Sequence, residues 1–247
     1  MPKVGVDLEQ HKVPAGNFTY SAAKIENLGA SEFTLVTIVN DTSGSVSNYR
    51  DLMEKTLAEV QSACKQSPRA DYLLIRHLQF NDNVHETHGF VPLDGLKPDQ
   101  YVNSLNIGGS TALFDATKNG LLAMSDYAKK LASQHFMANG ILIVMTDGDD
   151  NVSACSADDV KKAFDTVRKT EALESVLSIL VGVGYGDDKY IRDKLDVFHK
   201  EAGFSQFVDQ KDADAKTLAK LAAFISKSIS SQSQALGSGS VSKQLTF

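Results

Sequence analysis

The stretch FTLVTIVNDTSGSVS, residues 33–47, joins a short apolar run to an acid and three serines. Its apolar half, 33–39, is rich in β-branched residues, which is typical of a strand that is buried on both faces. The polar half begins where such a strand would reach the surface, and it carries the side-chain oxygens of Asp41, Ser43, Ser45 and Ser47. A capping turn, a hard cation, an exposed nucleophile or a phosphate could each use these oxygens.

Strand-like and helix-like segments alternate along the chain around this stretch. Apolar or alternating runs predict further strands at 70–80, 84–93, 140–146, 175–183 and 206–208. Apolar residues spaced by three and four predict helices at 49–64, 111–134, 157–170, 188–202 and 213–228. We therefore predict an α/β fold with a doubly wound, mostly parallel six-stranded sheet flanked by helices, in which 84–93 forms one antiparallel edge strand.

The two ends of the chain differ in composition from the part between them. Residues 1–31 are polar with one strand-like stretch at 18–25, so we expect an N-terminal arm that is able to pair with the sheet edge. Residues 32–230 carry the alternating pattern and form one predicted domain. Residues 231–247 are rich in Ser, Gln and Gly, which predicts a flexible tail.

Overall composition excludes several classes of protein. Of the 247 residues, 42% are apolar and 23% are charged, and the net charge of −6 comes without a Lys/Arg cluster longer than a pair, which argues against a nucleic-acid partner. The N-terminus lacks the apolar core of a secretory signal, and no segment approaches the roughly 20 apolar residues of a membrane span. Cys64 and Cys155 are too few for a disulfide framework. We expect a cytoplasmic protein without a membrane partner.

Three polar clusters follow predicted strands or begin predicted helices. They are Asp41-Thr42-Ser43-Gly44-Ser45, Gly108-Gly109-Ser110-Thr111 and Thr146-Asp147-Gly148. In an open α/β sheet, ligands bind beyond the carboxyl ends of the strands, at the point where the strand order reverses. Because helical connections between parallel strands bring such loops to one edge, we expect the three clusters to meet there.

The same three clusters resemble the motifs of the von Willebrand factor type A (vWA) domain, a Rossmann-like fold. The pattern DxSxS at 41–45, a distant threonine in GGSTALFDA at 108–116 and an aspartate in TDG at 146–148 occur in the order that the family shows, and the likeness covers roughly residues 33–228. The resemblance implies a metal-ion-dependent adhesion site (MIDAS) whose ligands are Asp41, Ser43, Ser45, Thr111 and Asp147. In the family, these oxygens hold Mg²⁺, and an acidic residue of a partner protein completes its coordination. The likeness extends to stand-alone cytoplasmic vWA proteins of bacteria.

The chemistry of these residues agrees with a hard cation. Mg²⁺ prefers six oxygen ligands and usually takes only one or two carboxylates. Asp41 and Asp147 would balance its charge, and neutral hydroxyls would fill other positions; Mn²⁺ and Ca²⁺ are alternatives. Zinc is not expected, because no Cys or His joins the three clusters.

Each candidate also has a purely structural interpretation. Asp41, Ser43 and Ser45 could form a capping turn before the first helix, Ser110 or Thr111 could cap the helix that follows, and Asp147 could belong to an Asp-Gly turn. Residues 149–151 are interpreted as a solvated loop, with support of the metal ligands as the alternative. Asp115 is interpreted as a residue that suits its helix dipole, with orientation of a metal-bound water or hydroxyl as the alternative. The GxGxG at 182–186 is better explained as a strand-to-helix turn than as a dinucleotide fingerprint. His85 and His88 lie three apart in a predicted strand and are a poor metal pair.

The function expected from the sequence is metal-dependent binding of a protein, without enzymatic activity. A metal-dependent hydrolase is the first alternative, but no His lies in the three loops and Ser43 is not in a GxSxG context. A structural subunit of a larger intracellular assembly is the second alternative. EDTA-sensitive capture of a partner distinguishes binding from metal-dependent turnover.

Overall fold

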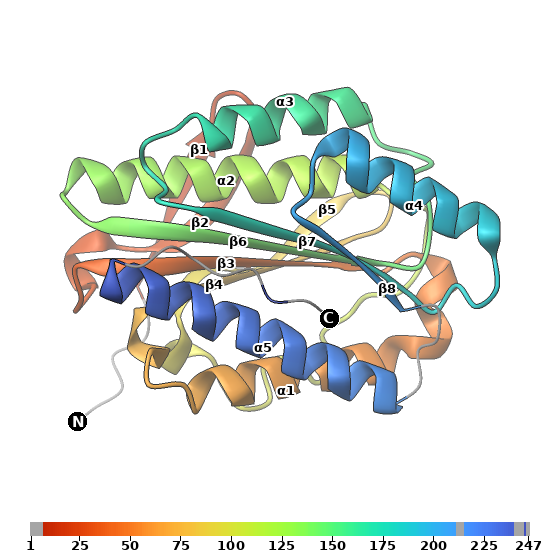
Figure 1. Ribbon diagram of the computed structural model, residues 1–247, viewed down its shortest axis with the longest axis horizontal. Coiled ribbons are helices and arrows are strands. Elements are labelled where there is room, and N and C mark those ends of the chain that lie inside the picture. The colour runs from red at the N-terminus through yellow and green to blue at the C-terminus, as the bar shows by residue number, and fades with distance from the viewer. Residues whose placement is uncertain (1–6, 211–214, 240–244, 246–247) are drawn as a thin grey trace.

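A mixed eight-stranded sheet forms the centre of the computed structural model, which describes residues 7–210, 215–239 and 245 (Figure 1). In these residues the strand order is β1-β2-β5-β4-β3-β6-β7-β8. The strands are β1 Leu8–Val13, β2 Phe18–Ala23, β3 Glu32–Asp41, β4 Leu73–Phe80, β5 Val84–Pro92, β6 Met137–Thr146, β7 Val176–Val183 and β8 Gln206–Gln210.

Helices cover both faces of this sheet, as the alternating sequence pattern predicts (Figure 1). They are α1 Arg50–Lys65, α2 Leu113–Ser133, α3 Ala157–Arg168, α4 Lys189–Ala202 and α5 Ala215–Ser238. The helices α2, α3 and α4 share one hydrophobic core with the sheet, and α1 and α5 share a second core on the opposite face. None of the described helices is both long and apolar enough to cross a membrane.

The strand β3 occupies the centre, where the first sequence stretch predicts a fully buried strand. It pairs in parallel with β4 on one side and with β6 on the other, and its residues from Phe33 to Asp41 are all buried. The chain first leaves β3 towards β4 and later returns to its other side as β6. The strand order therefore reverses between β3 and β6, and the carboxyl ends of these two strands lie next to each other.

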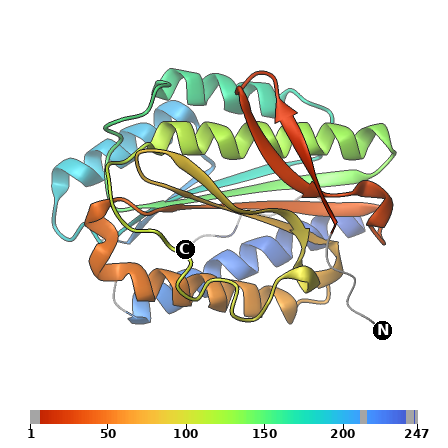
Figure 2. The same ribbon diagram turned by 180° about the vertical axis from the view of Figure 1, so that it is seen from behind.

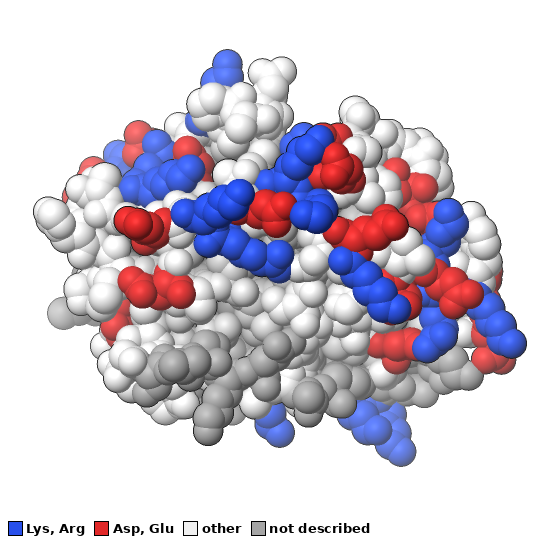
Figure 3. All heavy atoms as spheres, turned by 45° about the horizontal axis from the view of Figure 1, so that its top comes forward, with Lys and Arg blue, Asp and Glu red and all other residues white. Residues whose placement is uncertain are grey.

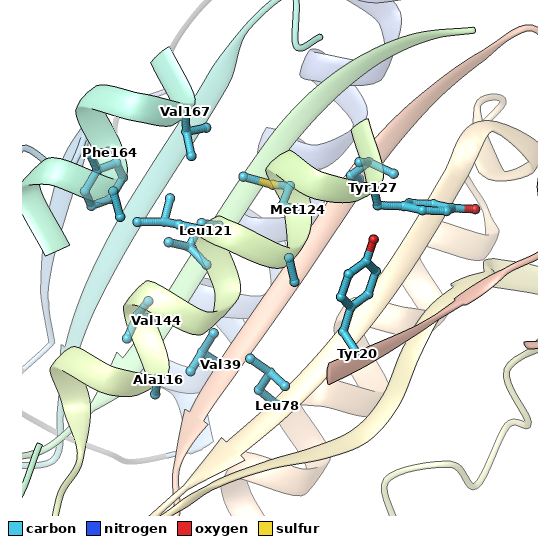
Figure 4. Packing of buried hydrophobic residues seen from close by; sticks show 14 of the residues in the cluster. Tyr20, Val39, Leu78, Ala116, Leu121, Met124, Tyr127, Val144, Phe164 and Val167 are labelled. Atoms are coloured by element: carbon cyan, nitrogen blue, oxygen red, sulfur yellow. The ribbon is translucent and has the colours of Figure 1, made fainter. Parts of the chain in front are cut away.

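The helix α2 packs its apolar side across the central strands. Figure 4 shows Leu121 and Met124 of this helix above Val39 of β3, with Tyr20 and Tyr127 at the end of the cluster. Tyr20 and Tyr127 meet edge to face with their ring centroids 6.4 Å apart. Aromatic pairs in this arrangement add to the stability that burial provides.

The prediction of six strands with one antiparallel edge strand is wrong in two respects. The described sheet has eight strands, and β5, although antiparallel to β4, is not at an edge. A hairpin of β1 and β2, built from the N-terminal segment, continues the sheet beyond β5 (Figure 2). The segment that could pair with the sheet edge thus forms two strands of the same sheet, and β1 is its outer strand.

A buried ion pair explains why the hairpin joins the sheet at this place. Arg76 of β4 is fully buried, and its Nε lies 2.6 Å from a carboxylate oxygen of Glu86 on β5. The other Glu86 oxygen accepts hydrogen bonds from the backbone N–H, at 2.9 Å, and from the hydroxyl of Ser21 on β2. At Gly89, a Cβ atom would come within 2.0 Å of the Ser21 carbonyl oxygen, so only glycine lets the strands approach this closely.

The helix α5 also departs from the sequence prediction, because it continues to Ser238 instead of ending near residue 228. Residues 231–238 are therefore helical, and the prediction of a flexible tail is wrong for them. Asn139 Nδ2 donates to the Gln232 carbonyl oxygen at 3.1 Å, and Arg69 Nε donates to the Ser233 hydroxyl at 3.3 Å. Gln232 and Ser233, whose polar composition predicts a flexible tail, are therefore buried against other elements. The predicted tail residues 240–244 and 246–247 lie outside the described residues.

Candidate metal centre

The three polar clusters meet where the strand order reverses. Asp41 is the last residue of β3, Ser43 and Ser45 follow it, Thr111 precedes α2, and Asp147 follows β6. A pocket of about 520 Å³ opens between them. Its lining residues are Ser45, Thr111, Asp147, Gly148, Asp149, Asp150, Asn151, Tyr185, Asp188, Tyr190 and Ile191. The structure thus brings all three loops to one edge of the sheet, as expected from the sequence.

Hydrogen bonds link four of the five predicted ligands into one network. The hydroxyl oxygens of Ser43 and Ser45 are 3.1 Å apart, and the Ser45 hydroxyl donates to Asp147 Oδ1 at 2.8 Å. Asp41 Oδ1 accepts from the Ser43 backbone N–H at 2.7 Å. This network joins two carboxylates and two hydroxyls, of which those of Ser45 and Asp147 line the pocket.

Thr146 is a member of this network that the sequence analysis did not single out. Its hydroxyl donates to Asp41 Oδ2 at 2.5 Å and accepts from the Gly148 backbone N–H at 3.2 Å. It therefore ties the end of β3 to the loop after β6. The signal was present in TDG, since a threonine at the end of a buried strand next to a candidate ligand needs a partner for its hydroxyl.

The two carboxylates are buried without a basic partner. Asp41 is fully buried, and burial raises its pKa to about 6, with the charge of Asp147 acting in the same direction and hydrogen bonds from Ser43 and Thr146 opposing both. Burial likewise raises the pKa of Asp147, against a hydrogen bond from Ser45. Among the described residues, no Lys, Arg or His side chain pairs with either acid. Two adjacent buried acids of this kind are stabilised by a bound cation.

Thr111 supplies the fifth oxygen and differs from the other four residues. Its side chain is only 5% exposed and lines the pocket, yet its hydroxyl forms no hydrogen bond with any described residue. Thr111 Oγ1 is not among the buried, unpartnered oxygens of the described residues, so the hydroxyl is open to the pocket. This hydroxyl, the two carboxylates without a basic partner and the two serines form an oxygen donor set that fits a hard divalent cation. The described residues contain no cluster of three or more His, Cys, Asp or Glu side chains that could hold a metal, so a cation here depends on hydroxyls.

The start of α2 is capped from a distant loop and not by Ser110 or Thr111. Its N-cap residue is Ala112, which has no side-chain cap. The acceptors come from residues 149–155, which we call the clasp loop: Asp150 Oδ1 accepts from the Phe114 N–H at 3.1 Å, and the Ser153 hydroxyl accepts from the Asp115 N–H at 3.0 Å. The prediction of side-chain capping by Ser110 or Thr111 is therefore wrong, because the acceptors lie almost 40 residues away in sequence.

The clasp loop is also more than the solvated loop that the sequence predicts. Asp115 accepts hydrogen bonds from the backbone N–H groups of Ala154 at 2.8 Å and Cys155 at 3.0 Å. Asn151 bonds to the backbone of Thr111 in both directions. Asp115 therefore binds the clasp loop with its carboxylate, besides lying in the first turn of its helix.

Two glycines shape the loop that carries Thr111. Gly109 has a φ of +84°, and a Cβ atom on it would lie 2.1 Å from Asp82 Oδ2. Its carbonyl oxygen accepts from the Gly44 N–H at 3.0 Å, and the Gly108 N–H donates to the Thr42 carbonyl oxygen at 2.8 Å. The pair of glycines thus lets the loop before α2 lie directly against the loop after β3.

The other motifs take their structural interpretations. Residues 182–186 run from the end of β7 towards α4, and Tyr49 donates its hydroxyl to the Gly184 carbonyl oxygen at 2.9 Å, as expected for a strand-to-helix turn. His88 contacts Tyr101, with Nε2 and the hydroxyl oxygen 3.1 Å apart, and it lies opposite His77 of β4. His85 lies opposite Gln79 instead.

Comparison with solved structures shows the fold, while no protein-family model and no curated protein matches the chain. The D319A mutant of the PilB minor pilin from Streptococcus sanguinis is similar with a TM-score of 0.62 and 13% identity, over 91% of this chain and 67% of that chain. The pilus adhesin SpaC from Lactobacillus rhamnosus GG is similar with a TM-score of 0.62 and 11% identity, over 87% of this chain and 32% of that chain. A third similar structure is proximal thread matrix protein 1 (PTMP1) from the mussel byssus, with a zinc-occupied MIDAS motif. Its TM-score is 0.53 with 17% identity, over 81% of this chain and 46% of that chain.

These identities are low, so the comparisons bear on the fold alone. They support the vWA-like α/β fold that the three motifs predict. The chain corresponds to between about a third and two thirds of the length of the chains it matches.

Proposed function

We propose that this protein is a metal-dependent protein-binding module that engages an Asp or Glu of a partner through a divalent cation. The observation that carries the proposal is the pocket lined by Ser45, Thr111 and Asp147, to which a hydrogen-bonded network connects Ser43 and the buried carboxylate of Asp41, with no basic partner for either acid among the described residues. Asp41, Ser43, Ser45, Thr111 and Asp147 would hold the cation. When bound, the cation supplies positive charge and an open coordination position for the carboxylate of the partner.

Each residue at the site would have a different role in binding the cation and the partner. Asp41 and Asp147 supply the negative charge, and Thr146 holds Asp41 in place through its hydroxyl. Ser45, which is exposed and bonded to Asp147, lies at the pocket and can exchange that bond for a metal contact. Thr111 presents a hydroxyl that needs no bond to be broken first. The exposed ring of Tyr190 at the rim offers contact area to the partner.

Mg²⁺ is the cation that we propose, with Mn²⁺ and Ca²⁺ as alternatives that the same oxygens could bind. The zinc-occupied MIDAS motif of PTMP1 bears on the argument against zinc. A MIDAS motif of another protein holds zinc, so zinc stays among the cations to be tested here. The fit of a hard cation therefore rests on the oxygen donor set and needs a direct measurement of metal preference.

We propose binding and not catalysis because the described lining of the pocket offers no His, Lys or Cys side chain. A hydrolase would need a general base within hydrogen-bond reach of its substrate, besides the metal. Asp147 belongs to the network, Asp150 accepts from the backbone of α2, and Asp188 caps α4. Asp149 accepts from the Asp150 N–H at 2.9 Å and pairs with Lys194 at 3.7 Å. These contacts favour a surface that is held rigid for a partner.

The predicted absence of nucleic-acid and membrane partners remains part of this proposal. On the face seen in Figure 3, Lys and Arg side chains are interspersed with Asp and Glu. Within α3, Lys161 pairs with Asp165 at 2.8 Å and Lys162 with Asp158 at 2.7 Å. Mixed charge of this kind does not favour a phosphate backbone. The cytoplasmic location stays a prediction, and proteins of pili and of byssus threads share the fold.

The proposal is tested by capture from the native lysate with Mg²⁺ and with EDTA, together with a screen for Mg²⁺-dependent hydrolysis of generic ester and phosphate substrates. We expect a partner that is retained with Mg²⁺ and released by EDTA, and no turnover. Thr111→Ala should weaken metal binding and, by a larger factor, partner binding, because the partner needs both the bound cation and the hydroxyl that joins it. Metal-dependent turnover without an EDTA-sensitive partner would contradict the proposal.

A further inference from the structure

We propose that Asn151 is a positioning residue that holds Thr111 where its hydroxyl can reach the cation. This inference rests on the proposed function and names a residue outside the five predicted ligands. Asn151 is exposed and lies in the clasp loop, four residues after Asp147. It lines the same pocket as Thr111.

Two hydrogen bonds join Asn151 to Thr111, one on each side of the threonine. Asn151 Oδ1 accepts from the Thr111 N–H at 2.8 Å, and the Asn151 N–H donates to the Thr111 carbonyl oxygen at 3.0 Å. The pair closes a ring around a single residue, so it restrains both peptide groups of Thr111. The first of these bonds is made by the Asn151 side chain, and the second joins the two backbones.

The restraint has a consequence for the hydroxyl of Thr111. Its backbone N–H and carbonyl groups are both bonded to Asn151, while its hydroxyl opens to the pocket and bonds to no described residue. The glycine loop before it is bonded to residues 42 and 44, and Ala112 after it donates to the Asn81 carbonyl oxygen at 2.8 Å. Asn151 supplies the restraint from the third side, which is the side of Asp147. It thereby links the threonine loop to the aspartate loop.

Loss of Asn151 should therefore act on the cation through Thr111. Residues that orient metal ligands typically affect metal affinity by about 10- to 100-fold when they are replaced. We expect Asn151→Ala to weaken Mn²⁺ binding by about tenfold, and Thr111→Val, which removes only the hydroxyl, to weaken it by a similar factor. In the double variant the second substitution should cost little more, because both remove the same contact.

The experiment is a double-mutant cycle in the full chain, measured by calorimetric titration with Mn²⁺ alone. Ser153→Ala is the matched control, because it removes a hydrogen bond of the same clasp loop to Asp115 and leaves Thr111 untouched. Asn151→Asp keeps an acceptor oxygen for the Thr111 N–H and should recover most of the affinity. Losses that multiply in the double variant, or an equal loss in Ser153→Ala, would overturn the inference.

A metal-free measurement gives a second readout. Hydrogen exchange of the Thr111 amide in EDTA should become faster in Asn151→Ala and stay unchanged in Thr111→Val, since valine keeps both backbone bonds. Unchanged exchange in Asn151→Ala would overturn the inference while leaving the proposed function intact. Failure of the wild-type protein to bind Mn²⁺ would overturn the proposed function, and this inference with it.

Discussion

Asp41 is at once the end of the central strand, a member of the hydrogen-bonded network and a buried acid. It ends the central strand, accepts hydrogen bonds from Ser43 and Thr146, and is fully buried beside a second acid. Its carboxylate is costly in the metal-free protein, because a buried charge without a cationic partner is destabilising. The same arrangement becomes favourable when a divalent cation binds. A residue that destabilises the metal-free fold and interacts favourably with a bound cation contributes to binding and not to stability.

Asp41→Asn should therefore separate metal binding from folding. The amide keeps a side-chain oxygen that can accept hydrogen bonds but removes the charge, so Mg²⁺ binding should be largely lost while the melting temperature in EDTA stays equal or rises. Calorimetric titration and a thermal melt in EDTA measure the two effects. Asp158→Asn, on the exposed start of α3, is the matched control for removing one acid. Wild-type Mg²⁺ affinity in Asp41→Asn would remove Asp41 from the site.

Two buried histidines on neighbouring strands predict a pH dependence of stability. Burial lowers the pKa of His77 well below its ordinary value, with the charge of His88 acting in the same direction, and burial also lowers the pKa of His88. Below about pH 6.5 the unfolded chain takes up protons that the folded protein does not, so folding stability is fully present above that pH and is lost as the pH falls. The slope is up to about 1.4 kcal/mol per pH unit for each histidine.

Urea unfolding in EDTA between pH 7.5 and 5 measures this dependence. We expect the free energy of unfolding of His77→Gln to fall less, or to rise more, than that of the wild type as the pH decreases below 6.5. The raised pKa values of Asp41 and Asp147 act in the opposite direction in both proteins, because the folded carboxylates take up protons before the unfolded ones. The same substitution at exposed His135 is the matched control. An identical pH profile in His77→Gln and the wild type would contradict the prediction.

At the scale of elements, the β1–β2 hairpin shows how a single buried charge organises a sheet. Arg76 has no exposed surface, so its charge depends on Glu86, and Glu86 in turn anchors Ser21 of β2. Buried ion pairs contribute little net stability compared with apolar residues, but removal of one partner is strongly destabilising. The hairpin is therefore held by the hydrogen bonds of Ser21 to Glu86 as well as by the apolar packing of Tyr20.

Glu86→Gln should destabilise the protein by about 3 kcal/mol, because it leaves the Arg76 charge buried without compensation. Chemical denaturation measures the loss, and faster hydrogen exchange of the β2 amides locates it. The double substitution Arg76→Met with Glu86→Leu should recover most of the stability, since no buried charge remains. A loss no larger than that of the surface substitution Asp158→Asn would show that the pair does not hold the hairpin.

For the molecule as a whole, metal binding and folding are coupled. The proposed ligands come from segments after β3, before α2 and after β6, which meet only in the folded chain. A cation that binds the folded state and not the unfolded chain stabilises the fold by mass action. The same coupling means that the cation restrains loops from both halves of the sheet at once.

Saturating Mg²⁺ should raise the melting temperature. At a hundredfold excess over the dissociation constant the stabilisation is about 2.7 kcal/mol, which corresponds to about 5–10 °C for a domain of this size. A thermal melt in Mg²⁺ and then in EDTA measures the shift, and Asp147→Ala should abolish it. An equal shift in Asp147→Ala would assign the effect to cations bound elsewhere.

The sequence by itself determined the features that local pattern encodes. The alternation of apolar strands with helices specified the central parallel sheet, and its three polar clusters were expected at one edge. The resemblance of these clusters to the vWA motifs then named Asp41, Ser43, Ser45, Thr111 and Asp147 as candidate ligands. Each of these patterns spans only a few consecutive residues, so it can be recognised without knowledge of the fold.

Only the tertiary structure decided the features that depend on contacts between distant residues. The hairpin joins the sheet through Ser21 and Glu86, which are 65 residues apart, and Thr146 reaches Asp41 across 105 residues. Asn151 clasps Thr111 from 40 residues away, and α5 extends through polar residues because their partners lie on other elements. A buried polar side chain is stable only if a partner satisfies it, and its own sequence neighbourhood does not say which partner the fold will bring.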